Sequence, residues 1–451
     1  MATDFDLIIR NSNVVRDNTV IAATIGIADG KIIAVDQDLT GSAKTEINAK
    51  GLHTFPGLID IHVHFNDPGR ADWEGIPTGS ASLAAGGGTT FFDMPLNSSP
   101  PVLNAESFDR KVTAATGNSH TDFALWGGLT PNNLDHMEEL AARGVIGFKA
   151  FMSNSGIDDF SHSDDLTLYR GMMKAKQLNL PIAVHAESDT ITSMLTAEAI
   201  AAGKLSPTDY LDSRPIVAEV EAVERAIILA EETGCRLHIV HVSNSRSIEQ
   251  VRRAATRGEC DVTCETCPHY LILNRDDLLR LGPSAKCAPP LRTAAENDNL
   301  WHDLAAGKIP IIASDHSPSP PGMKTDKNFF KVWGGIAGVQ STLPILLTHD
   351  PALPLSIIAD VTAMNPAKRF GLSTKGQIAV GMDADLTLVN VAASFELKRE
   401  NLLDRHKLSP YVGRTFNGIV KQTILRGTTI FANGKITAPP AGRLIKPTDP
   451  C

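Results

Sequence analysis

From residue 55 onward, short apolar runs alternate with longer stretches in which apolar residues recur at helical spacing. Eight apolar runs are typical of buried strands: residues 57–65, 89–94, 121–126, 145–151, 181–186, 236–242, 261–267 and 310–314. Helical patterns lie between them, such as 134–143 and 217–233, and the second ends at Gly234, a common helix C-terminal residue. Eight strand-then-helix units predict an α/β fold, a (β/α)8 TIM barrel over residues 55–375.

Both ends of the chain show a different pattern, with short β-like segments and tight turns. The N-terminal segments are 7–10, 14–15, 22–27 and 31–35, and the C-terminal ones are 386–389, 420–425 and 428–431. Asp29-Gly30 and Asn433-Gly434 are hairpin signals, and a short helix is expected at 365–371. We therefore predict a small β-sandwich domain, built from residues 1–54 and 376–451, beside the barrel.

The composition is that of a globular protein, with 451 residues, 42% hydrophobic and 21% charged. A net charge of -9 gives no electrostatic footprint for nucleic acid or an acidic membrane. No uncharged apolar run approaches the roughly 20 residues that span a bilayer. Residues 1–6 are acidic and lack the apolar region of a signal peptide. Together with six scattered cysteines, these features predict a cytoplasmic protein.

Cys264 and Cys267 form a C-x-x-C motif inside a predicted strand. Strand residues three positions apart face opposite sides, so the two thiols would diverge. No second C-x-x-C is present to complete a zinc site. We interpret both residues as small buried hydrophobic side chains.

The first barrel strand ends in two histidines, His62 and His64. Positions two apart on a strand share a side, so the two imidazoles point the same way. Neutral imidazoles placed like this are good ligands for a divalent metal. Taken alone, they fit a pair of buried, hydrogen-bonded histidines equally well.

Other strand ends supply more groups of the same kind. In a (β/α)8 barrel the functional groups lie at the C-terminal ends of the strands. His185 ends the fifth strand, His241 ends the sixth and Asp315 follows the eighth, while Lys149 lies within the fourth. Each could be an ordinary polar residue near a strand end, but their coincidence at five strand ends predicts a metal site.

Three further histidines are given other roles. His238 precedes His241 by three positions and should face the other side, so we interpret it as structural. His316 is adjacent to Asp315, and the charge of the aspartate favours Asp315 as the ligand. His269, after the seventh strand, is expected to support a ligand or to contact the substrate.

Lys149 is a lysine within an apolar run, where it must find a partner or lose its charge. A neutral amine can add carbon dioxide to form a carbamate, an anion able to bridge two metals. Two divalent ions, less the carbamate, Asp315 and a bridging hydroxide, leave a charge of about +1. The interpretation is a two-metal site that acidifies a shared water.

These residues resemble the binuclear cyclic amidohydrolases: dihydroorotase, dihydropyrimidinase (hydantoinase) and allantoinase. The resemblance rests on His62-Val63-His64, Gly147-Phe148-Lys149-Ala150-Phe151, His185, His241 and Ser314-Asp315-His316. It implies that one metal is held by His62, His64, Lys149 and Asp315, and the other by Lys149, His185 and His241. It further implies N6-carboxylysine at Lys149, zinc as the expected metal with cobalt, manganese or nickel as alternatives, and a homodimer or homotetramer.

Within this superfamily the chain is most similar to the allantoinases, in segments 66–70, 73–75, 93–98, 151–156 and 334–340. Dihydroorotases typically carry an arginine two residues after the second histidine to hold the substrate carboxylate, and here that residue is Asn66. Hydantoinases typically carry a tyrosine just after the lysine motif, where this chain has Ser153-Asn154. The resemblance thus implies a polar ring substituent, which the ureido group of allantoin would fit.

The implied reaction opens the hydantoin ring of (S)-allantoin to give allantoate, in purine degradation. A metal-bridging hydroxide would attack the ring carbonyl, and Asp315 would carry its proton to the departing nitrogen. The residues expected to contact the substrate are Asn97, Ser153, Cys287 and Ser317. The first alternative is a hydantoinase acting on another cyclic amide. The second is a non-catalytic scaffold paralogue, which should have lost metal ligands, whereas every expected position is filled here. The third is a mononuclear deaminase, and Lys149 is evidence against it.

Overall fold

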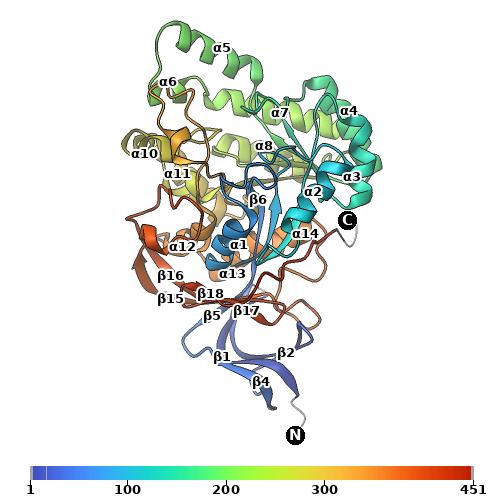
Figure 1. Ribbon diagram of the computed structural model, residues 1–451, viewed down its shortest axis with the longest axis vertical. Helices are drawn as coiled ribbons and strands as arrows, with labels where there is room; N and C mark the ends of the chain where they lie inside the picture. The colour runs from blue at the N-terminus through green and yellow to red at the C-terminus, as the bar shows by residue number, and fades with distance from the viewer. Residues whose placement is uncertain (1–3, 17, 448–451) are drawn as a thin grey trace.

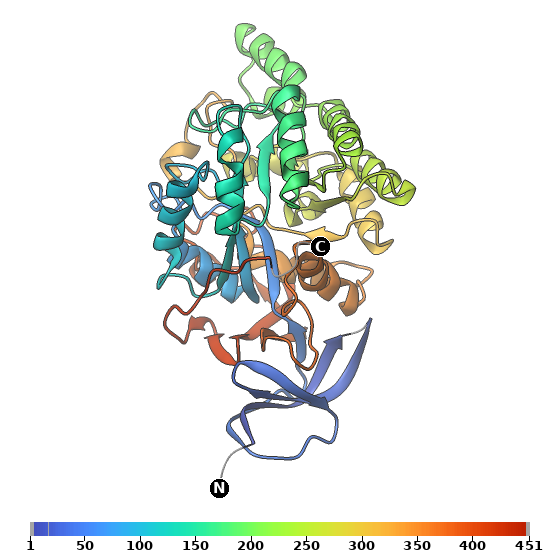
Figure 2. The same ribbon diagram turned by 90° about the vertical axis from the view of Figure 1, so that its right-hand side faces the viewer.

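The computed structural model describes residues 4–16 and 18–447. Figure 1 shows helices and strands packed together in the upper part of the molecule and a curved β layer at its base, which Figure 2 shows from the side. The predicted α/β fold class is confirmed. Each of the eight predicted runs contains a parallel strand of the barrel. These strands are β6 (Leu58–Val63), β7 (Gly88–Asp93), β8 (Asp122–Leu125), β10 (Phe148–Phe151), β11 (Ile182–His185), β12 (Leu237–Ile239), β13 (Val262–Thr266) and β14 (Ile311–Ile312).

Hydrogen bonds close these strands into a ring at two places. After β8 the chain runs directly into β9 (Gly127–Gly128), which pairs in parallel with β10. At the other side, the His64 amide donates to the His316 carbonyl at 2.8 Å. The Ser314 amide donates to Asp60 Oδ1 at 3.1 Å, which ties the last strand to the first. The C-terminal ends of all the strands therefore face one end of the molecule.

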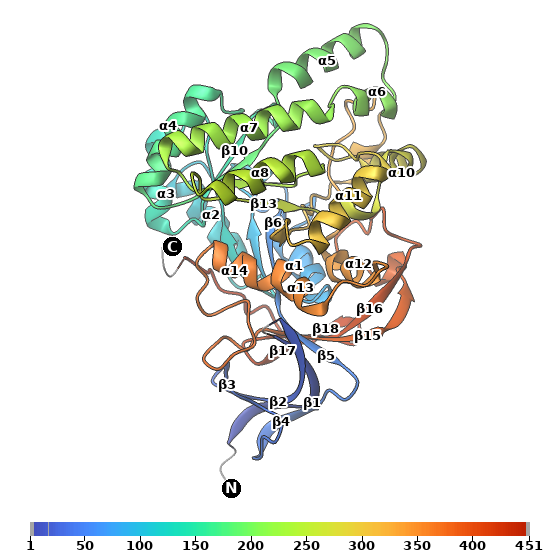
Figure 3. The same cartoon turned by 180° about the vertical axis from the view of Figure 1, so that it is seen from behind.

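The helices cover the outside of this ring, and Figure 3 shows α7, α8 and α11 side by side there. The helix predicted at 217–233 is confirmed as α7 (Ile216–Thr233), which ends at Gly234 with a left-handed φ of 65°. The other long helices are α1 (Ile76–Ala85), α2 (Ala105–Ala115), α4 (Asp165–Gln177), α5 (Asp189–Ala201), α8 (Ser245–Arg257) and α11 (Ala294–Ala305). The shorter ones are α3 (Met137–Arg143), α6 (Pro207–Asp212), α9 (Pro268–Ile272), α10 (Arg275–Leu281), α12 (Thr342–Thr348), α13 (Leu355–Ala359) and α14 (Asn365–Arg369).

The β layer is one nine-stranded sheet in the part of the chain that the structure describes, ordered β18-β17-β16-β15-β5-β1-β2-β3, with β4 paired to β1. Its N-terminal strands are β1 (Phe5–Arg16), β2 (Thr19–Ala28), β3 (Lys31–Asp36), β4 (Ala43–Asn48) and β5 (His53–Pro56). Its C-terminal strands are β15 (Leu386–Glu396), β16 (Thr415–Leu425), β17 (Thr428–Ala432) and β18 (Lys435–Ile436). The two ends of the chain meet where Thr54 of β5 faces Leu388 of β15.

The sheet thus joins both ends of the chain, as the pattern predicts. The domain limits, 1–54 with 376–451 against 55–375, stay a prediction, and residues 1–3, 17 and 448–451 lie outside the described residues. A buried ion-pair cluster connects sheet and barrel. In it, Lys375 Nζ contacts Asp122 Oδ2 at 2.8 Å and Asp385 Oδ2 at 2.5 Å.

Two further sequence interpretations concern cysteines and membranes. Cys264 and Cys267 are buried and free, as are Cys235, Cys260 and Cys287. Burial raises the pKa of the Cys264 thiol, in keeping with an inert side chain in the core. Among residues 4–16 and 18–447, no helix combines the length and the apolar character needed to cross a bilayer.

Candidate active site

A cleft of about 390 Å³ opens at the C-terminal ends of the barrel strands. Thr192 and Ser193 of α5 line it together with Tyr210 of α6, the two helices that lie farthest from the β sheet in Figure 1. Its floor contains the predicted ligands His62, His64, His185, His241 and Asp315. Lys149 is fully buried behind this floor, so five of the six predicted ligands lie open to the cleft.

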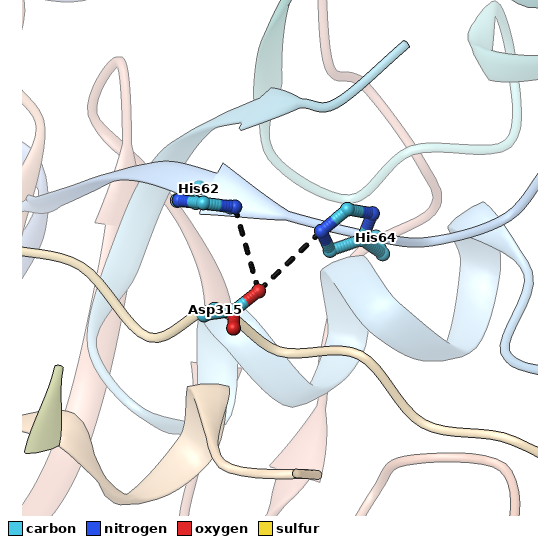
Figure 4. A group of neighbouring side chains, drawn as sticks. All are labelled: His62, His64 and Asp315. Atoms are coloured by element: carbon cyan, nitrogen blue, oxygen red, sulfur yellow. Dashed lines mark ion pairs between the residues drawn. The ribbon is translucent and has the colours of Figure 1, made fainter. Parts of the chain in front are cut away.

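His62, His64 and Asp315 form the first group of predicted ligands, shown in Figure 4. The Nε2 atoms of both histidines lie 3.4 Å from the same Asp315 carboxylate oxygen. The two histidines come from the end of β6, and Asp315 follows β14, which is joined to β6 by ring closure. Two imidazole nitrogens and one carboxylate oxygen at this separation can enclose a single divalent ion.

The far nitrogens of these histidines are held by fixed partners. His62 Nδ1 bonds Glu265 Oε1 at 2.5 Å, and His64 Nδ1 donates to the Leu96 carbonyl at 2.9 Å. A nitrogen that donates carries the proton, so the lone pair of each ring lies on Nε2 and faces Asp315. The supporting groups thus set the tautomer that metal binding needs.

Lys149, His185 and His241 form the second group. His185 Nδ1 and His241 Nε2 lie 3.1 Å apart, and Lys149 Nζ is 4.9 Å from the centre of the Phe151 ring. His185 Nε2 bonds Glu187 Oε2 at 2.7 Å, so its free lone pair is on Nδ1.

The two groups adjoin each other, since the ring centres of His62 and His241 are 5.3 Å apart. Lys149 Nζ and His241 Nδ1 are buried and have no hydrogen-bond partner within the described ranges. An unpartnered buried amine calls for an explanation, and an ion or a missing group next to Lys149 would supply one. Burial lowers the pKa of Lys149 to about 7, which makes the neutral amine accessible for carbamate formation. This donor set therefore fits a pair of divalent ions bridged by a modified lysine.

The two carboxyl groups next to His62, those of Asp315 and Glu265, are ionised. Burial alone would raise the pKa of Asp315, but His62 and His64 outweigh it and hold that pKa far below its usual range. Burial also opposes ionisation of Glu265, yet His62 and His238 lower its pKa to about 2. Desolvation lowers the pKa of His62 and His185, which favours the neutral imidazole that a metal ion requires.

Two of the predicted ligands have strained backbones. His241 has a φ of 38° and Asp315 a φ of 45°, in the left-handed region that non-glycine residues seldom adopt. Such a conformation costs on the order of 1–3 kcal/mol per residue and persists where the surrounding structure enforces it. Both residues stand just after strand ends, where the left-handed turn redirects the chain as it enters the cleft.

Three of the four residues predicted to contact the substrate lie at the cleft. Asn97, Cys287 and Ser317 line the cleft. Ser153 does not line it: the side chain is 1% exposed, and its Oγ has no hydrogen-bond partner among the described residues. The next residue, Asn154, lines the cleft instead.

The other histidines are placed as follows. His238 bonds Thr263 Oγ1 at 2.8 Å and Glu265 Oε2 at 3.1 Å, away from the cleft. His316 Nδ1 accepts the Gly338 amide at 3.1 Å, so it faces away from the ligands. His269 is buried, and neither ring nitrogen has a hydrogen-bond partner in the described chain.

Glu265, Glu187 and Arg214 were not predicted. Arg214 donates from Nε to Glu187 Oε1 at 3.1 Å, and thereby neutralises the carboxylate behind His185. A signal for two of these residues was present in the sequence. Glu265 is a charged residue inside an apolar strand, as Lys149 is, and Glu187 follows His185 by two positions.

Known proteins resemble this chain along almost its whole length. A model described as the amidohydrolase family matches residues 54–430. Allantoinase from Solibacter usitatus is 53% identical, with 98% of this chain and 97% of that protein aligned. Allantoinase from Rubrobacter xylanophilus is 52% identical, with 98% of each aligned. The solved structure of an L-hydantoinase (dihydropyrimidinase) from Arthrobacter aurescens is 34% identical with a TM-score of 0.95, covering 98% of this chain and 100% of that one.

Proposed function

The chain belongs to the amidohydrolase family, and we infer that it is a hydrolase that opens the hydantoin ring of allantoin to give allantoate. The observation that carries this inference is the identity of more than half of the residues, over nearly the full length, to allantoinases. The hydantoinase structures are less similar in sequence, so hydantoinase activity on other cyclic amides is the less favoured function.

We propose that the site holds two divalent ions. One would be held by His62, His64 and Asp315, the other by His185 and His241, with Lys149 shared between them as a carbamate. When bound, the ions polarise the ring carbonyl and acidify the attacking water. Zinc is the proposed metal because imidazole nitrogens and carboxylate oxygens suit it, and cobalt, manganese and nickel accept the same donors.

Asp315 is the proposed proton carrier. Its carboxylate is ionised and 8% exposed, at the floor of the cleft. It can therefore accept a proton from the attacking water and release it to the ring nitrogen as the amide bond breaks. The Nε2 atoms of His62 and His64 approach only one of its two oxygens, each at 3.4 Å, so the second oxygen is available to the substrate.

The walls of the cleft support a polar cyclic substrate. Its lining includes the amide and hydroxyl side chains of Asn97, Asn154 and Thr192. It also includes the large apolar side chains of Phe151 and Val332. Amides and hydroxyls can pair with the several N–H and C=O groups of a ureido-substituted hydantoin. We propose Asn97, Cys287 and Ser317 as substrate contacts on this basis. Ser153 also stays a proposed substrate contact, through an Oγ that has no hydrogen-bond partner among the described residues.

A cytoplasmic location is also proposed, supported by free, buried cysteines that suit a reducing compartment. The homodimer or homotetramer implied by the resemblance stays a prediction.

The decisive experiment assays metal-reconstituted protein against allantoin, hydantoin, dihydrouracil and dihydroorotate. We expect allantoin to have the highest kcat/KM, with allantoate as the product. A higher kcat/KM for any of the other three rings would overturn the proposed substrate. Metal content measured on the same preparation tests the two-ion site separately.

A further inference from the structure

One wall of the cleft is the segment 329–335, which we call the clasp loop. Phe330, Val332, Trp333 and Gly335 of this loop line the cleft. The loop belongs to no helix or strand, so its backbone carbonyls need partners from elsewhere. The source of those partners determines how strongly the conformation of the loop is held.

Two lysines outside the loop supply the partners. Lys286 Nζ donates to the carbonyls of Phe329 and Val332 at 2.7 and 2.5 Å, and lies 3.4 Å from that of Phe330. Lys324 Nζ donates to the carbonyls of Trp333 and Gly335 at 2.9 and 2.8 Å. The two ammonium groups thus gather the carbonyls of residues 329, 330, 332, 333 and 335.

Both lysines are buried, at 4% and 9% exposure, and neither forms an ion pair with a carboxylate in the described chain. A buried lysine without a carboxylate is uncommon, because desolvation of its charge is costly. Here burial lowers the pKa of Lys286 to about 7 and that of Lys324 to about 8. The cost is offset by charge-assisted hydrogen bonds that exist only while the loop keeps this conformation.

The clasp loop also contacts the segment that carries Lys286 and Cys287. The Gly335 amide donates to the Lys286 carbonyl at 2.7 Å, and Cys287, the next residue, lines the cleft. The Tyr210 hydroxyl donates to the Cys287 carbonyl at 2.8 Å, and Lys286 Nζ lies 4.5 Å from the centre of the Tyr210 ring. Clasp loop and Cys287 segment are therefore held as one unit.

We propose that Lys286 and Lys324 are positioning residues that hold the clasp loop in its substrate-binding conformation and so set substrate affinity. Neither lysine lies among the proposed metal ligands, and the effect is one on binding and not on the chemical step. The kinetic part of the proposal rests on the proposed function, whereas its structural part does not.

The test uses Lys286→Met and Lys324→Met in the metal-loaded full chain. Hydrogen exchange without substrate is expected to speed up in peptides that cover 329–335 and to stay unchanged in the barrel strands. KM for allantoin should rise roughly tenfold, as for the loss of one charge-assisted hydrogen bond, with a much smaller change in kcat. Metal content should not change.

Lys327→Met is the matched control, because Lys327 is exposed and lies in the same stretch of chain. Lys286→Gln and Lys324→Gln keep a neutral donor and should fall between wild type and the Met variants, and they carry the test if a Met variant does not fold. Unchanged exchange at 329–335 in both lysine positions would overturn the proposal. So would a fall in kcat with KM unaltered. Because exchange is measured without substrate, it gives an answer even if allantoin proves not to be the substrate.

Discussion

The two halves of the proposed metal site differ in the charge of their buried side chains. In the half around His62 and His64, Asp315 and Glu265 are anionic. In the half around His185 and His241, the third proposed ligand is Lys149, whose nitrogen has no hydrogen-bond partner in the described chain.

The supporting groups differ in the same direction. Glu265 bonds two histidines, His62 and His238, and no cationic side chain within the described ranges neutralises it. Glu187 stands behind His185, but Arg214 neutralises it. The first half is thus ready to hold a cation as it stands, whereas the second requires a change at Lys149 before it can. One half is therefore preformed, and the other is conditional on the modification of Lys149.

The largest expected effect comes from the preformed half. Asp315→Asn removes the proton carrier while keeping the shape of the side chain, so kcat should fall about a thousandfold with the fold retained. Steady-state kinetics, with circular dichroism as the check on folding, measures this. Turnover close to that of wild type would exclude Asp315 as the carrier.

The next effect tests the conditional half directly. Lys149→Ala removes the only proposed bridge, so the protein should lose the ion held by His185 and His241 and keep the one held by His62, His64 and Asp315. Elemental analysis of the purified variant would then find one ion per chain, and steady-state kinetics would find impaired hydrolysis. Retention of both ions would show that no carbamate on Lys149 bridges them. The two halves would then not differ in the way described.

A smaller, paired effect comes from the supporting carboxylates. Loss of a group that orients a ligating histidine typically weakens metal binding about 10- to 100-fold. Glu265→Gln should weaken the ion next to His62, and Glu187→Gln the ion next to His185, as measured by titration with a chelator. If both substitutions weakened the same ion, the two halves would not be separable.

The smallest effect is on pH-dependent stability of the metal-free protein. Burial lowers the pKa of Lys149 from 10.5 to about 7, so between these values the unfolded chain binds more protons than the folded one. Stability should therefore rise with pH, on the order of 2 kcal/mol between about pH 7 and pH 9. Urea unfolding of wild type and Lys149→Met gives the difference, since the Met variant lacks this proton. Parallel curves for the two proteins would show that Lys149 titrates normally.

Much of the fold could be predicted from sequence because the barrel strands are buried on both sides and read as continuous apolar runs. β4 was missed because Ala43–Asn48 is largely polar and exposed, an edge strand without apolar alternation. β5 was missed because it is only His53–Pro56, and its pairing with β15 depends on a partner far along the chain.

The predicted ligands could be found because each stands at a strand end, where the position of the strand decides where the side chain points. The sequence shows Glu265 as a charge inside an apolar strand, but it does not show that this residue bonds His62, which lies 203 residues away along the chain. Ser153 shows the limit at a loop: after β10 ends at Phe151, the alternation of a strand no longer tells which of two neighbours, Ser153 or Asn154, faces the cleft.

The pairing of β5 with β15 has a consequence for how the protein is made. β1 to β5 are translated before the barrel, but β15, the second neighbour of β5, is translated only after it. The barrel can therefore fold while one edge of the N-terminal sheet is still open, and an open strand edge invites pairing with other chains. A nascent chain interrupted after the barrel would carry the complete set of proposed ligands together with that unprotected edge.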